Sequence, residues 1–102
     1  MVCASVEVIG VHCWPDAPER QAFLRAKHRH TFCVTAWVEV PHGDRAVECF
    51  DLADAARTVL GEFRGDFGTL SCEHIASHLI QRLGLSRCLV LEDGKQGAEV
   101  WA

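Results

Sequence analysis

The order of the secondary-structure patterns predicts an α+β fold, with two helices on one face of a four-stranded antiparallel sheet. Two segments with the two-residue periodicity of strands come first, two segments with helical periodicity follow, and two short strand-like segments come last. Strands and helices segregated in this way are typical of α+β domains. The sequence has 102 residues, so we expect one domain over residues 1–102.

The first strand is predicted over residues 2–12, because side chains on a strand alternate between its two faces. Its more apolar face carries Val2, Ala4, Val6, Val8 and His12. Residues 13–27 contain Pro15 and Pro18, so this segment is predicted to be a connection with at most a short helical turn.

The second strand is predicted over residues 28–40, where one face is apolar and the other is mostly polar. The even-numbered face carries His28, His30, Phe32, Val34, Ala36, Val38 and Val40, and the odd-numbered face includes Arg29, Thr31, Thr35 and Glu39. Residues 41–44 have the composition of a turn.

Two amphipathic helices are predicted over residues 51–61 and 71–83. The apolar positions of the first are Leu52, Ala55, Ala56, Val59 and Leu60, and those of the second are Ile75, Ala76, Leu79, Ile80 and Leu83. Asp51 and Ser71 are predicted to cap the starts of the helices, and Gly61 and Gly84 to end them.

The last two strands are predicted over residues 86–92 and 98–102. Between them, residues 93–97 contain two glycines and an aspartate, which is typical of a hairpin loop.

Charge, apolar run length and cysteine spacing indicate which partners and which cellular compartment to expect. The formal net charge is −4 and no basic run occurs, which argues against nucleic acid and anionic membranes as partners. No segment approaches the roughly 18 apolar residues of a membrane span, and Glu7 interrupts the first apolar run, so no signal peptide is expected. The six cysteines are scattered without a CxxC motif, so we expect reduced thiols and a cytoplasmic protein.

Three histidines are candidate metal ligands. His28 and His30 share one strand face, and His12 ends the preceding strand on its more apolar face. If these strands pair as antiparallel neighbours, the three imidazoles meet at one end of the sheet. Three protein ligands leave a fourth position on zinc for water or substrate, as in catalytic sites, and protonation would weaken the site below about pH 6.5. The alternative is three separately hydrogen-bonded polar residues.

Two further histidines are spaced as a metal pair would be. His74 and His78 lie four residues apart on the second predicted helix, but on its polar face. A solvated helix face is the favoured interpretation.

The histidine positions resemble those of the 6-pyruvoyl-tetrahydropterin synthases and the 6-carboxy-tetrahydropterin synthases of queuosine biosynthesis. In that family one metal histidine ends the first strand, as His12 does, and a pair opens the second strand, as in His28-Arg29-His30. The resemblance implies the tunnelling fold, in which β-β-α-α-β-β units assemble into an oligomeric barrel. It also implies a zinc ion on His12, His28 and His30, a pterin anchored by Glu92, and self-association as trimers or hexamers.

The expected catalytic groups of the family are replaced in this chain. Leu24 stands where the family has its catalytic cysteine, four residues before the histidine pair, and Asp66-Phe67 stands in place of an Asp-His dyad. The groups left to move protons are Cys13, Asp66 and His74. Cys13 is the best placed of them, because zinc beside His12 would lower the pKa of the thiol.

Three functions therefore remain as hypotheses. The first is a zinc-dependent lyase of the pterin-synthase type that acts on a dihydropterin-like heterocycle with altered or reduced catalysis. The second is a catalytically silent module that binds metal and a pterin or purine-like ligand. The third is a structural oligomer in which the metal only stiffens the sheet. The replacements at Leu24 and Phe67 favour the second over the first.

Overall fold

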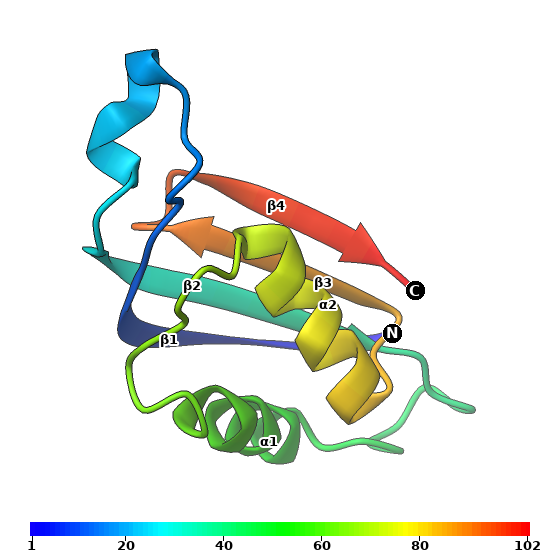
Figure 1. The fold of residues 1–102 in the computed structure, drawn as a ribbon. Helices are drawn as coiled ribbons and strands as arrows, with labels where there is room; N and C mark the ends of the chain where they lie inside the picture. Colours follow the sequence, from blue (N-terminus) through cyan, green and yellow to red (C-terminus); the bar gives the residue numbers. More distant parts are fainter.

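Four antiparallel strands in the order β1-β2-β3-β4 form a single sheet, and two helices pack against it (Figure 1). The computed structural model describes residues 1–102. The strands are β1 (Val2–His12), β2 (His28–Val38), β3 (Arg87–Glu92) and β4 (Gln96–Trp101), and the helices are α1 (Cys49–Gly61) and α2 (Cys72–Leu83). The predicted α+β class and element order are confirmed.

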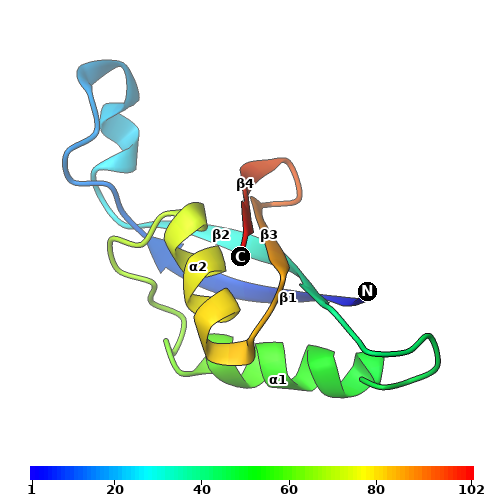
Figure 2. The same cartoon turned by 90° about the vertical axis from the view of Figure 1, so that its right-hand side faces the viewer.

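The hydrophobic core lies between the helices and one face of the sheet. Helix α1 packs against β1, while α2 packs against β3 and β4 (Figure 2). The most deeply buried large side chains of this core are Phe32, Val34, Leu60, Ile75, Leu79 and Val90. The predicted apolar faces of the second strand and of both helices are therefore the faces that leave water, which is the main favourable term in folding.

The register of the first strand pair determines where the candidate ligands lie. His12 pairs with His28, and Gly10 pairs with His30. On the other side of β2, Phe32 pairs with Glu92 of β3. Directly paired residues point to the same side of a sheet, so these side chains share the helix-covered face.

Three element boundaries differ by two residues from those predicted. Strand β2 ends at Val38, and β4 begins at Gln96 because only residues 93–95 leave the hairpin ladder. Helix α1 begins at Cys49, and its N-cap is Glu48, whose side chain accepts hydrogen bonds from the backbone N–H groups of Phe50 and Asp51. Asp51 lies inside the first turn, so its predicted capping role is wrong. An acidic residue there still interacts favourably with the helix dipole.

The caps of α2 are those predicted. The Ser71 hydroxyl accepts a hydrogen bond from the backbone N–H of His74 at 3.2 Å. Gly84 ends the helix with a φ of 64°, a backbone conformation that glycine adopts without the usual steric cost.

Residues 13–27 form an arm that extends beyond the sheet (Figures 1 and 2). It contains a short 3₁₀ helix, η1 (Glu19–Leu24). The base of the arm is closed by a hydrogen bond of 2.7 Å from the Trp14 N–H to the Leu24 carbonyl, and the Arg25 guanidinium donates to the Ala17 carbonyl at 2.8 Å. Neither α1 nor α2 has the length and apolar character that crossing a membrane would require.

Candidate metal centre

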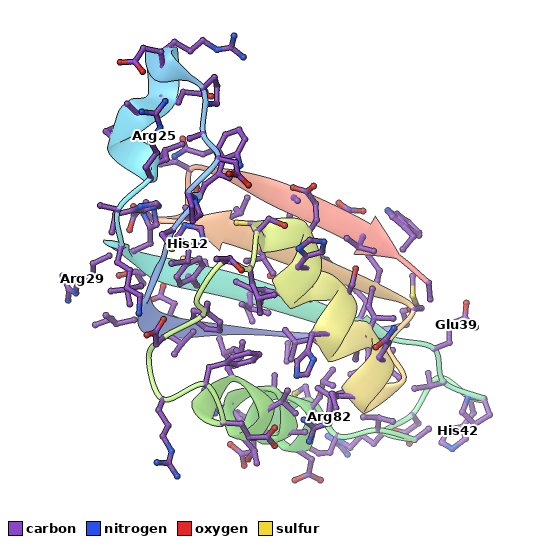
Figure 3. The ribbon with its side chains drawn as sticks, viewed as in Figure 1. His12, Arg25, Arg29, Glu39, His42 and Arg82 are labelled. Carbon is purple, nitrogen blue, oxygen red and sulfur yellow. The ribbon has the colours of Figure 1, made fainter.

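The three candidate histidines converge where β1 ends and β2 begins, next to the arm. Figure 3 shows His12 at the end of the sheet opposite Glu39 and His42. The ring centroids of His12 and His28 are 4.6 Å apart, those of His28 and His30 are 5.0 Å apart, and those of His12 and His30 are 5.4 Å apart. One nitrogen of each ring and one Glu92 oxygen all lie within 4.8 Å of one another. This cluster could hold a metal ion.

Each imidazole is oriented by a hydrogen bond at its Nδ1 atom. Nδ1 of His12 bonds to the Leu70 carbonyl at 2.9 Å, and Nδ1 of His28 bonds to the Ala26 carbonyl at 2.9 Å. Nδ1 of His30 bonds to the Asp93 carboxylate at 2.7 Å. Because all three partners are acceptors, the ring proton resides on Nδ1. The lone pair of each Nε2 is then free to bind a metal, as is usual for metal-binding histidines.

The surroundings of the Nε2 atoms of His12 and His30 show whether a metal ion fits this site. Both atoms are buried, and neither has a hydrogen-bond partner. A Glu92 oxygen approaches them at 2.7 and 3.2 Å, but not in the direction that a hydrogen bond requires. A buried polar atom left unsatisfied costs about 1–3 kcal/mol. Imidazole nitrogens and a carboxylate oxygen that face one another without hydrogen bonds form a donor set that suits a divalent transition-metal ion.

An aromatic floor supports the histidines from the core. The Phe32 ring lies 5.1 Å from the His12 ring and 5.7 Å from the His30 ring, centroid to centroid. Phe67 packs on Phe32 at 4.9 Å. Beneath them, Gly10 leaves the space that Phe67 occupies, since a Cβ atom there would lie 2.6 Å from the ring.

A cavity of about 480 Å³ opens beside the histidines. Its volume is within the range of roughly 300–1,000 Å³ that is typical of small-molecule sites. Its walls come from the start of the arm, the segment that leads into α2, and the β3–β4 hairpin. The residues around it are His12, Cys13, Trp14, Leu24, His28, Thr69, Leu70, Ser71, Cys72, Glu73, Glu92, Gln96 and Gly97.

The predicted proton-transfer residues are not all in this cavity. Cys13 lines it, because β1 ends at His12 and the chain turns there, so the alternation of the strand no longer applies. Asp66 lies outside the lining and is paired with the Lys27 ammonium, which together with the Gly68 N–H lowers the pKa of its carboxyl. His74 is exposed in the first turn of α2 and also lies outside the lining.

The two replacements noted in the sequence have different surroundings. Leu24 contributes an apolar patch to the cavity wall. Phe67, which stands where the resemblance implies an imidazole, is only 2% exposed and belongs to the core.

Two residues of the site were not identified from the sequence. Cys72 lines the cavity, and burial, together with the negative charges of Glu92 and Glu73, raises the pKa of its thiol to about 12. This thiol therefore stays protonated at neutral pH. Asp93 bonds to His30, and this bond, with a second from the Thr31 N–H, lowers the pKa of the Asp93 carboxyl. In the sequence, only the position of Asp93 directly after Glu92 indicated that it could belong to the site.

Comparison with known proteins adds no relative from which residue roles can be transferred. No protein-family model matches the chain, and no curated protein matches it significantly.

Proposed function

We propose that this chain is a zinc-dependent protein of the pterin-synthase type, which binds a dihydropterin-like heterocycle in the cavity beside His12, His28 and His30. One observation supports this most strongly: buried imidazole nitrogens without hydrogen-bond partners adjoin a cavity of about 480 Å³ that has a carboxylate in its wall. The third hypothesis, a metal that only stiffens the sheet, does not explain why such a cavity adjoins the site.

The proposal assigns metal binding, ligand binding and proton transfer to different residues. His12, His28 and His30 hold the zinc ion, which supplies a Lewis acid for oxygen atoms of the ligand. Glu92 accepts two hydrogen bonds from the guanidine-like edge of the heterocycle. Trp14 and Leu24 provide apolar surface beside it, and the Cys13 thiol is the group best placed to move a proton.

Catalysis by this site is reduced or absent in the proposal. Leu24 cannot take a proton, and Phe67 leaves no room for an imidazole. A catalytically silent module that binds zinc and a pterin or purine-like ligand is the second candidate, and these same observations favour it.

The proposal includes assembly into the oligomeric barrel of the tunnelling fold, as trimers or pairs of trimers. The outer strands β1 and β4 each pair with only one neighbour. Ile9 is 53% exposed and Trp101 is 62% exposed on these outer strands. Open strand edges with exposed apolar side chains invite pairing with another copy.

The metal site is tested by elemental analysis of zinc-loaded protein after removal of free metal. We expect about one zinc per chain in the wild type and a large loss in a His28→Ala, His30→Ala double variant. His74→Ala, His78→Ala is the matched control, because these histidines lie on α2 outside the cavity. Zinc that persists undiminished in the His28, His30 variant would contradict the proposal.

The ligand is tested by calorimetric titration of zinc-loaded and metal-free protein with neopterin, and with guanosine as the purine probe. We expect neopterin to bind the zinc-loaded protein more tightly than the metal-free protein. Absence of binding for both probes would refute the ligand part of the proposal and leave the metal site standing.

A further inference from the structure

We propose that Asp93 is a positioning residue of the metal centre, whose carboxylate fixes the tautomer and orientation of His30. This inference rests on the proposed metal binding by the histidine cluster. It is based on the Asp93 side chain, which connects the β3–β4 hairpin to β2 by hydrogen bonds to the consecutive residues His30 and Thr31. One carboxylate oxygen accepts the His30 Nδ1–H at 2.7 Å, and the other accepts the Thr31 N–H at 2.9 Å.

The backbone of Asp93 makes this bridge rigid. Its N–H donates to the Thr31 carbonyl at 2.7 Å, so Asp93 and Thr31 are joined by two bonds. Asp93 also has a φ of 56°, in the left-handed region that aspartate and asparagine tolerate better than most residues. The carboxylate is thus held directly against the ring of His30.

His30 differs from the other two histidines in its partner. His12 and His28 donate to neutral backbone carbonyls, whereas His30 donates to a carboxylate. A carboxylate acceptor makes the opposite ring nitrogen a stronger metal ligand, and it selects the tautomer with the proton on Nδ1. Asp93 therefore acts on the metal through His30 and does not bind it.

The informative substitution is Asp93→Asn in the full chain. Asparagine accepts the same positive φ, so the turn is preserved. Its side chain has one acceptor and one donor group, whereas the site presents two N–H donors. The amide oxygen can serve Thr31 or His30, but not both. When it serves Thr31, its NH₂ group faces the ring and favours the tautomer with the proton on Nε2, the nitrogen that must bind metal.

We expect Asp93→Asn to weaken zinc binding by about 10- to 100-fold, measured by competition with a chromogenic chelator. We also expect ¹⁵N NMR of the metal-free variant to show a larger share of His30 in the Nε2–H tautomer. Asp93→Gly keeps the positive φ and removes both side-chain bonds, so it should lose zinc affinity as well. Asp54→Asn is the control, because it removes the same charge from an exposed position on α1.

The outcomes separate this inference from the proposed function. If the wild type binds zinc and Asp93→Asn binds it equally well, the role of Asp93 is overturned and the metal site stands. If Asp93→Gly retains wild-type affinity, the side-chain bonds are not needed, and the role is again overturned. If the wild type itself binds no zinc, the proposed metal site fails, and the role of Asp93 toward the metal fails with it.

Discussion

Glu92 faces both the histidine nitrogens and the cavity, and its chemistry can be tested at the level of a single atom. We expect Glu92→Gln to weaken neopterin binding and to leave zinc and fold intact, since three histidines remain. A carboxylate accepts two donors, whereas an amide must present a donor to one of them. Losing such a charge-assisted pair costs about 1.5–3 kcal/mol, or about ten- to a hundredfold in affinity, measured by calorimetry.

Glu73→Gln is the matched control for Glu92→Gln, because Glu73 also lines the cavity but belongs to the exposed first turn of α2. Equal neopterin affinity in wild type and Glu92→Gln would show that Glu92 is not the anchor. Loss of zinc in Glu92→Gln would make Glu92 the fourth metal ligand, in agreement with its 2.7 Å approach to the Nε2 of His12.

The apolar side chain of Leu24 is one reason to expect low enzymatic turnover. We expect zinc-loaded protein to convert little or no dihydroneopterin triphosphate to a 6-pyruvoyl or 6-carboxy product. A general acid or base typically contributes about 10²–10⁴-fold, and Leu24 and Phe67 stand where the resemblance to the pterin synthases implies two such groups. A steady-state assay of wild type beside Leu24→Cys measures this, because residue 24 lines the cavity.

Wild-type turnover near that of an ordinary pterin synthase would refute the expectation for Leu24. It would also show that the site contains a base other than those that the resemblance implies. Cys13→Ser would then be the first variant to assay, because the Cys13 thiol lines the cavity next to His12.

At the level of elements, β1 allows the Phe67 ring to approach it closely at Gly10. The position pairs with His30, and an added Cβ would lie 2.6 and 2.8 Å from two ring atoms of Phe67. We expect Gly10→Ala to lower the free energy of unfolding by about 1–3 kcal/mol, as overpacking does in a core. Urea denaturation at fixed protein concentration measures the change.

Gly61→Ala is the same chemical change at an open position, because nothing lies within 4 Å of the Cβ that would be added at the end of α1. Replacing glycine by alanine in a helix is favourable by roughly 0.5–1 kcal/mol, so the sign is expected to reverse. Gly10→Ala with wild-type stability would mean that Phe67 can move away from β1 at no cost, and the floor under the histidines would not be rigid.

At the scale of the whole molecule, the open sheet predicts self-association. A chain of this size buries a smaller share of its surface on folding alone than a larger domain does. The edge strands β1 and β4 also each pair with only one neighbour. We expect sedimentation equilibrium at micromolar concentration to show trimers or hexamers. A monomer under these conditions would contradict the barrel assembly.

Periodicity and spacing were enough to predict much of this protein. Alternation along residues 2–12 and 28–40 identified both strands, the second of which ends at Val38, and the shared face of His12, His28 and His30, since a strand has only two faces. Most of the apolar positions of both helices and the Ser71 and Gly84 caps were also predicted correctly, because their signals lie within a few neighbouring residues. In α1, however, the buried residue is Ala53 and not Ala55.

The tertiary structure alone decided how distant segments meet. The register that pairs His12 with His28 and Phe32 with Glu92 depends on hydrogen bonds between strands that are far apart in sequence. The same holds for the Asp93 bridge to His30 and for the pairing of Asp66 with Lys27, which leaves Asp66 outside the cavity lining. Local patterns determine which face a side chain takes, whereas its partner is decided by long-range pairing and by the shape of the turn that brings it there.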